Sequence, residues 1–295
     1  MATLYTYAES NIRKTLILIT LFLIFIIGLG WVFSNYFQNP GILVFAVIFS
    51  ILMSFSSYWY SDKIVLALTR ANPIEKEDKP ELYRAVENLC ITAGLPLPKI
   101  YILPEDQPNA FATGRDKNHA VIAVTQGLLE KLDRTELEGV ISHELSHIGN
   151  KDMLLMTVVV VLVGFISIIT DWFLRSMWFG GFRKRDNRGG GSILVLVGLI
   201  LAILSPIVAK LIQLAISRKR EFLADASGAL LTRYPEGLAR ALEKIAVDKS
   251  PLKVASTATA HLYISNPFKE KKFSSLFMTH PPIEERIKAL RDLRI

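Results

Sequence analysis

TELEGVISHELSHIGNKD, which starts at Thr135, is the stretch on which every later inference depends. Thr135 and Glu138 have the spacing of a capping box, so we expect a helix to begin there. Residues four apart share one face of a helix, which lets His143 and His147 bind one metal ion. Glu144 then lies beside the ion and can act as a general base, an H-E-x-x-H pattern typical of zinc peptidases. The alternative is a helix that carries two histidines by coincidence.

Composition narrows the class of protein. The chain has 295 residues, is 51% hydrophobic and carries a formal net charge of +7. In so apolar a chain a basic excess is typical of cytoplasmic segments that flank a membrane, and no interleaving of aromatic and basic residues indicates nucleic-acid binding. The single cysteine, Cys90, excludes an internal disulfide. Its place on the apolar face of a helical pattern predicts a buried thiol rather than a nucleophile.

Two membrane-spanning helices are predicted in the N-terminal segment, 1–61. No charged side chain occurs from residue 15 to residue 61, which leaves room for two spans of about 20 residues. An Asn-Pro-Gly motif at 39–41 marks the turn between them. Arg13 and Lys14 precede the first span while the turn is uncharged. This asymmetry places the N-terminus in the cytoplasm, and two crossings return residue 62 to the same side.

Two soluble segments, 62–152 and 215–295, are predicted to form the rest of the folded unit. The first contains helical patterns and three short apolar runs bounded by turn residues, which predict a small sheet. The second is predicted to be helical. The expected strands are Lys99–Leu103, Asn109–Thr113 and His119–Val124, and the expected helices are Glu81–Thr92, Gln126–Leu132, Arg220–Leu231, Pro235–Val247 and Pro282–Leu293.

The apolar segment 153–214 separates these two soluble segments. Its uncharged runs, 153–170 and 189–209, predict two further transmembrane helices. The loop 171–188 between them is rich in arginine, which opposes the positive-inside rule if both helices cross. A hairpin that packs on the membrane or on the protein without crossing is therefore the alternative.

Two histidines are not a complete catalytic zinc site, because such a zinc usually has three protein ligands. The pattern with a third histidine six residues after the second is excluded, since residue 153 is Met. Glu221 and Asp225, four residues apart in SRKREFLADASGA, are the best candidates. Glu221 would be the third ligand, and Asp225 would hold the far nitrogen of a ligand histidine. The alternative is a solvated face paired with Arg218 or Arg220.

Taken together, these motifs resemble one family over nearly the whole chain. They comprise two leading spans, NAFATG, HELSHIGNKD, two further hydrophobic segments, SRKREFLADASGA and THPPIEERI. This combination is similar to that of the HtpX-type membrane-bound zinc metallopeptidases, relatives of the CAAX prenyl protease type 1 (Ste type) family. The resemblance implies one Zn²⁺ per chain, with His143, His147 and Glu221 as ligands, Glu144 as catalytic base and Asp225 behind the ligands.

The resemblance also implies a set of residues that contact the substrate or stabilise the oxyanion: Asn109, His280 and Arg286. The sequence around Asn109 is a short apolar strand that could pair with an extended peptide, although an ordinary core hairpin has the same pattern. His280 is held rigidly before two prolines, and either His280 or Arg286 could stabilise an oxyanion.

The predicted fold class is α+β and mainly helical. It is an integral membrane protein in which transmembrane helices carry a cytoplasmic, gluzincin-like zinc peptidase domain with a small β-sheet. The predicted function is a zinc-dependent endopeptidase of a bacterial inner membrane that cleaves membrane-protein or unfolded polypeptide substrates at the cytoplasmic face. The resemblance implies quality control and a stress response. Two alternatives stay open: a CAAX-type prenyl-protein processing peptidase, and a non-catalytic membrane adaptor with structural zinc closed by four protein ligands.

Overall fold

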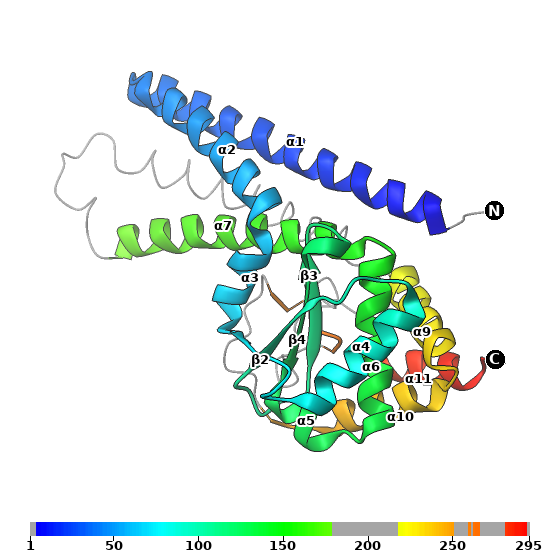
Figure 1. The fold of residues 1–295 in the computed structure, drawn as a ribbon. Coiled ribbons are helices and arrows are strands. Elements are labelled where there is room, and N and C mark those ends of the chain that lie inside the picture. Colours follow the sequence, from blue (N-terminus) through cyan, green and yellow to red (C-terminus); the bar gives the residue numbers. More distant parts are fainter. Residues whose placement is uncertain (1–3, 179–217, 251–258, 261, 266–280, 294–295) are drawn as a thin grey trace.

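The computed structural model describes residues 4–178, 218–250, 259–260, 262–265 and 281–293 (Figure 1). The predicted site residue His280 and the apolar run 189–209 lie outside the described residues. The helices are α1 (Leu4–Phe37), α2 (Gly41–Trp59), α3 (Ser61–Thr69), α4 (Pro80–Ala93), α5 (Gln126–Lys131), α6 (Arg134–Gly149), α7 (Asp152–Trp178), α9 (Arg218–Thr232), α10 (Pro235–Val247) and α11 (Ile283–Arg291).

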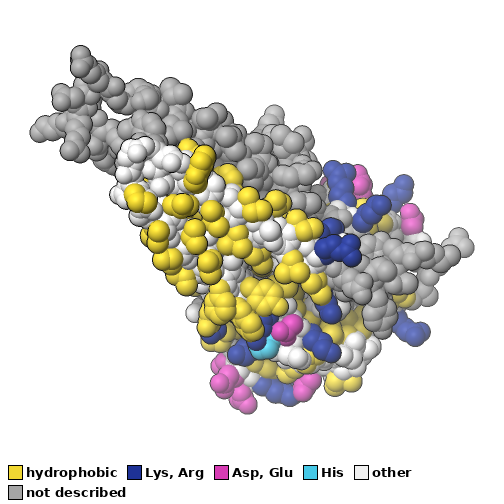
Figure 2. All heavy atoms as spheres, turned by 90° about the horizontal axis from the view of Figure 1, so that it is seen from above, with side chains coloured by type: hydrophobic (Ala, Val, Ile, Leu, Met, Phe, Trp, Pro, Cys, Tyr) yellow, Lys and Arg dark blue, Asp and Glu magenta, His cyan; other side chains and the backbone are white. Residues whose placement is uncertain are grey.

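Helices α1 and α2 form a hairpin at the place of the two predicted N-terminal spans. Ser10–Asn35 of α1 and the whole of α2 are each long and apolar enough to cross a membrane. Gly30 of α1 lies directly against Ala46 of α2, where a side chain would not fit, so the two backbones approach closely. Figure 2 shows hydrophobic side chains covering the outer face of this hairpin, as a lipid-facing surface requires.

A four-stranded sheet forms the centre of the soluble unit. It consists of β1 (Asn72–Pro73), β2 (Lys99–Leu103), β3 (Ala110–Gly114) and β4 (Ala120–Thr125), in the order β1-β2-β4-β3. Strands β2 and β4 are parallel, and β3 is antiparallel to β4. The three predicted strands are confirmed, whereas β1 and helix α3 were not predicted. Strand β3 lies at one end of the sheet, so among the described strands only β4 neighbours it and its other side is free of a strand.

Both faces of the sheet are covered, because alternate residues of each strand pack on different helices. Ile122 and Val124 belong to the cluster formed with α4, α6 and α10. Phe111 and Ala123 belong to a second cluster, formed with α7. A sheet buried on both faces needs continuous apolar runs, which is why these strands lack a polar side. Cys90 of α4 is buried in the first cluster, so the predicted buried thiol is confirmed, and burial raises its pKa to about 11.

Helix α7 contains the first of the two apolar runs that were predicted to cross the membrane further along the chain. It meets α6 at a bend of 86°, measured to Ile166. In this first part the side chains of Val158–Val163 are at most 5% exposed, because α1, α2 and the sheet cover them. The start of the apolar run is therefore a core element of the protein, and its crossing of the membrane stays a prediction.

Candidate metal centre

Helix α6, which carries the H-E-x-x-H residues, has Asp133 as its N-cap, two residues before the predicted N-cap Thr135. The Asp133 side chain accepts a hydrogen bond from the Glu136 backbone (2.9 Å), and the Glu136 side chain accepts one from the Asp133 backbone (2.8 Å). Thr135 instead donates to Asp133 (2.7 Å), so the predicted capping box of Thr135 and Glu138 is wrong. Aspartate is at least as good an N-cap as threonine, and it lies at the earlier position.

Helix α9 packs antiparallel on α6, and a glycine makes the contact possible. A Cβ at Gly228 would lie 2.9 Å from the backbone nitrogen of His143, so a larger residue would push the helices apart. The close contact brings Asp225 opposite His143 and Glu221 opposite His147. Both carboxylates are buried, at 2% and 3% exposure, so the alternative of a solvated face is wrong.

His143, His147 and Glu221 converge on one point. Each offers a ligand atom, and these three atoms lie within 4.8 Å of one another. The two Nε2 atoms are 3.2 Å apart, and Glu221 Oε1 and Oε2 lie 3.6 Å from His147 Nε2 and 3.8 Å from His143 Nε2. Ligands of a tetrahedral zinc with bonds of about 2.0–2.2 Å are separated by roughly 3.3 Å. The donor set and its spacing therefore fit zinc.

The far nitrogen of each histidine faces a carboxylate. Nδ1 of His143 lies 2.9 Å from Oδ1 of Asp225, as predicted for Asp225. Nδ1 of His147 lies 3.2 Å from Oδ2 of Asp152, the first residue of α7. With a proton on each Nδ1, the two Nε2 atoms are left as metal-binding lone pairs. A role for Asp152 was not predicted, although it lies only five residues after His147.

Arg286 of α11 lies behind Asp225 and is fully buried. Its Nε and Nη2 donate to the two carboxylate oxygens of Asp225 at 2.8 and 2.7 Å, a bidentate pair. Nη1 lies 3.7 Å from Glu221 Oε2. Burial alone would raise the pKa of Asp225, but the Arg286 charge outweighs it and keeps the pKa below its usual value. Asp225 is thus anionic and can hold His143.

Glu144 lies beside the three ligand residues, with its carboxylate near strand β3. It is 2% exposed, and it accepts a hydrogen bond from the backbone N–H of Ala112. Burial raises the pKa of Glu144 to about 7. A carboxylate with a pKa near neutrality can both accept and release a proton at physiological pH, as a general base requires.

The free side of β3 holds another part of the chain, Leu262–Ser265. The Ala110 carbonyl accepts a hydrogen bond from Ile264 N (3.0 Å). The side-chain amide of Asn109 donates to Ser265 O (3.1 Å) and accepts from Ser265 N (3.4 Å). Asn109 is therefore placed at the sheet edge that leads to Glu144, with its amide engaged by backbone groups.

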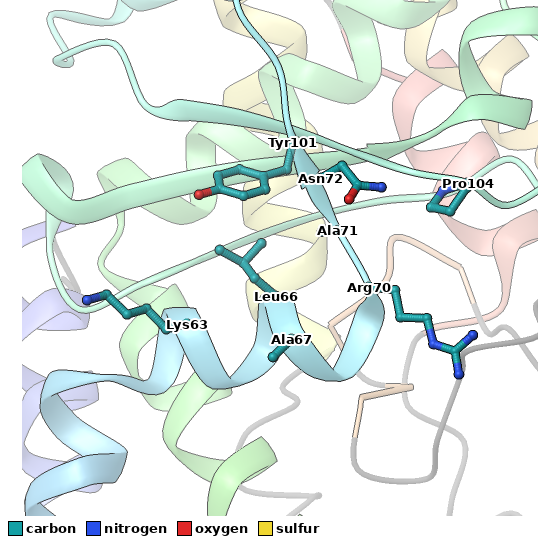
Figure 3. Close-up of a pocket in the computed structure, with 8 residues that line it drawn as sticks. All are labelled: Lys63, Leu66, Ala67, Arg70, Ala71, Asn72, Tyr101 and Pro104. Carbon is teal, nitrogen blue, oxygen red and sulfur yellow. The ribbon is translucent and has the colours of Figure 1, made fainter.

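A hollow of the described surface lies between α3 and β2, away from the metal site (Figure 3). Its lining includes Leu66, Tyr101 and Pro104, and none of the metal-site residues. The side chains of Lys63 and Arg70 extend in different directions from its two ends (Figure 3), so they do not converge on a shared ligand.

A model of peptidase family M48 matches residues 76–294, which include every ligand candidate named above. The chain belongs to peptidase family M48. Proteins named protease HtpX homolog are similar to it over most of its length. That of Caldanaerobacter subterraneus subsp. tengcongensis is 51% identical, covering 99% of both chains, and that of Thermococcus sibiricus is 50% identical, covering 91% of this chain and 92% of the other. The solved structure of Ste24p from S. mikatae aligns with a TM-score of 0.49 and 19% identity, covering 97% of this chain and 67% of the other.

Family membership confirms the predicted activity class. M48 peptidases are metal-dependent, so this chain is a metallopeptidase, and its two helices that are long and apolar enough to cross a membrane agree with a membrane-bound enzyme. The relatives that are about 50% identical are named protease HtpX homolog. The alternative of a CAAX-type processing enzyme is therefore not favoured. The predicted role of His280 falls outside the described residues and stays a prediction.

Proposed function

We propose that this M48 member is a zinc-dependent endopeptidase that cleaves extended polypeptide segments beside the membrane. The observation that carries the proposal is the convergence of three buried ligand atoms, from His143, His147 and Glu221, next to the buried carboxylate of Glu144. A structural zinc would be closed by four protein ligands. The group found in the described part of the chain has three, which leaves one position for water.

In the proposed mechanism, zinc when bound supplies Lewis acidity toward a water molecule and toward the scissile carbonyl. Glu144 removes a proton from the water as the water oxygen attacks the carbonyl carbon. The Ala112 N–H holds the Glu144 carboxylate in place during this step. As the C–N bond breaks, Glu144 passes the proton to the leaving amine.

The substrate is proposed to lie along the free side of β3. The Ala110 carbonyl and the Asn109 amide point to that side, where each already binds backbone groups. Arg286 holds Asp225 and donates to a backbone carbonyl at the same edge (2.8 Å), which supports a role in fixing the peptide. His280 is proposed, from the family resemblance alone, to contact the oxyanion.

The site is proposed to face the cytoplasm at a bacterial inner membrane. This is supported by Arg13 and Lys14 before the first span, by the uncharged turn after it, and by two crossings before the soluble unit. A peptidase fixed at the bilayer meets cytoplasmic segments of membrane proteins, so misassembled or unfolded membrane proteins are the proposed substrates, in a quality-control role.

The proposal is tested with Glu144→Gln in the full-length, detergent-solubilised protein. We expect this variant to keep its zinc and to lose at least about a hundredfold in the rate of casein or membrane-protein cleavage, because a general base contributes 10²–10⁴-fold. Glu138→Gln, on the same helix, is the matched control and should stay active. A fully active Glu144→Gln protein, or cleavage that persists after chelation, would refute the mechanism. A wild-type protein that binds zinc tightly but cleaves nothing would favour the adaptor alternative.

A further inference from the structure

The corner between α6 and α7 joins the metal site to the first membrane helix. One oxygen of Asp152 lies 3.2 Å from His147 Nδ1. The other accepts a hydrogen bond of 2.6 Å from Nδ2 of Asn11, in α1. All three residues are at most 5% exposed. A residue of a membrane-spanning helix is therefore separated from a metal ligand by a single carboxylate.

Asn11 holds both sides of this corner with one amide group. Its Nδ2 also donates, at 3.5 Å, to the carbonyl of Asn150, the C-cap of α6. Arg220 Nη1 lies 3.7 Å from the same Asp152 oxygen, so the Asn11 amide makes the shorter of its two contacts. Removing that amide would weaken the hold on a buried carboxylate, so Asp152 would shift toward Arg220 and away from His147.

Helix α1 is itself fixed along this region. Leu18 is 1% exposed and lies in the cluster of Phe111 from β3 and Leu155 from α7. Further along, the rings of Phe22 and Phe165 meet edge to face, with centroids 6.2 Å apart. Because α1 packs on both α7 and the sheet, the position of Asn11 is set by how this helix sits in the molecule.

From this geometry we propose that Asn11 and Asp152 are positioning residues for His147, so that α1 supports the metal site as well as anchoring the chain. The inference rests on the proposed zinc function. Carboxylates behind ligand histidines change metal affinity by about 10- to 100-fold. Asn11 acts through Asp152, so its effect is smaller and depends on that residue.

The test is a double-mutant cycle for zinc affinity in the full-length protein, measured by competition with a chromophoric chelator. We expect Asp152→Ala to weaken zinc binding about 10- to 100-fold, and Asn11→Ala to weaken it about three- to tenfold, as for one hydrogen bond to a charged group. In the Asp152→Ala background, Asn11→Ala should add less than about twofold. Thr15→Ala, one turn along α1 and bonded within that helix, is the matched control and should leave affinity unchanged.

Cobalt substitution gives a second readout that does not depend on activity. The visible absorption band of the Co²⁺-loaded protein should shift in Asn11→Ala, because the His147 ring changes its orientation, and not in Thr15→Ala. Wild-type zinc affinity and an unshifted band in Asn11→Ala, or additive effects of the two substitutions, would overturn the inference. A wild-type protein that binds no zinc would instead overturn the proposed function.

Ile264 and Ser265 lie along the edge of β3 that faces away from β4. The backbone of Ile264 and Ser265 is bound at four points by groups that the proposed function assigns to substrate. Ile264 N donates to the Ala110 carbonyl (3.0 Å), and Ile264 O accepts from Arg286 Nη1 (2.8 Å). Ser265 exchanges its two hydrogen bonds with the Asn109 amide. An extended peptide added to a sheet edge is held in this way.

We infer that Ile264 and Ser265 occupy the place of the substrate backbone, and that this segment must leave the edge before cleavage. Ala112, two residues after Ala110 on β3, binds Glu144, so the occupied edge leads directly to the proposed base. This second inference also rests on the proposed function, but it is independent of Asn11 and Asp152.

Ile264→Pro tests it, because proline removes the N–H that binds Ala110. We expect kcat/KM for an unfolded polypeptide to rise about tenfold, the equivalent of one lost hydrogen bond of the competing segment, with zinc affinity unchanged. Ile264→Val keeps the N–H and should behave as wild type. Activity at or below wild type in a folded, zinc-loaded Ile264→Pro protein would overturn the inference. If that variant does not fold, Ser265→Pro, which removes the N–H donated to Asn109, decides by the same criterion.

Discussion

The two histidines of the metal site are held from opposite sides of the molecule. His143 is backed by Asp225, which is fixed by the bidentate Arg286 within the soluble unit. His147 is backed by Asp152, which takes its hydrogen bond from Asn11 on a membrane helix. The first support is a bidentate pair with Arg286, whereas the second combines the neutral Asn11 amide with Arg220 of α9, whose Nη1 lies 3.7 Å from Asp152. One half of the site is therefore held by the soluble unit alone, and the other half is held by the soluble unit and the membrane hairpin together.

Removing the arginine behind His143 should have the largest effect on stability. Arg286→Met leaves the Asp225 carboxylate buried without its cation, which typically costs about 3–5 kcal/mol of unfolding free energy. Asn11→Ala, behind His147, should cost about 1–3 kcal/mol, because it removes a neutral donor. Chemical denaturation of the metal-free proteins measures both. Arg291→Met, on the exposed side of the same helix, is the control, and equal losses in the Arg286 and Asn11 variants would contradict the comparison.

The next largest effect should come from separating α6 from α9, which lowers both stability and zinc affinity. Gly228→Ala places a Cβ 2.9 Å from His143 N, and overpacking of this kind costs about 1–3 kcal/mol. Zinc affinity should fall with it, because Glu221 and Asp225 move with α9. Gly149→Ala, at the end of α6, meets nothing within 4 Å and should be neutral or slightly stabilising. A Gly228→Ala protein with wild-type stability and zinc affinity would show that the helix contact does not set the site.

The smallest expected effect is on the pH dependence of zinc binding, which should show that the two histidines differ in protonation state. Burial lowers the pKa of both rings. For His147 the Asp152 hydrogen bond and the Glu221 charge outweigh burial and raise the pKa to about 9, whereas the pKa of His143 stays below its usual value. At about pH 8 the metal-free protein therefore has His147 as a cation, with both ring nitrogens protonated, and His143 as a neutral ring. Zinc must displace one proton from His147, so affinity should fall about tenfold per unit as the pH decreases.

Calorimetry of zinc binding in buffers of different ionisation enthalpy counts the protons released. At about pH 8 we expect about one proton per zinc from His147, with up to one more from the zinc-bound water. Release of no proton would show that His147 is not protonated in the metal-free protein.

The site residues that could be predicted from the sequence are those that helical periodicity brings together. His143 with His147, and Glu221 with Asp225, could each be placed on one helix face because residues four apart are neighbours. Asp152 escaped this rule, since a bend of 86° separates it from His147. Asn11 contacts Asp152 across 141 positions of the chain, and no local pattern encodes such a contact. The contact between Asn109 and Ser265 beside β3 likewise joins residues 156 positions apart.

Hydrophobicity alone could not tell lipid from protein as the partner of an apolar helix. The run that begins at Met153 has the composition of a transmembrane helix, yet its first part is covered by other helices and the sheet. The α1–α2 hairpin has a similar composition and exposes large side chains such as Ile24 and Phe45, at 63% and 68%. Only the packing separates these two cases.

Zinc K-edge absorption of the purified full-length protein reports the metal and its ligands together. We expect about one zinc per chain with two imidazole nitrogens and carboxylate or water oxygens at about 2.0–2.2 Å. We also expect Glu221→Ala to lose most of this zinc, while Glu138→Ala keeps it. A sulfur ligand, a third imidazole, or full zinc occupancy in Glu221→Ala would contradict the assignment of His143, His147 and Glu221.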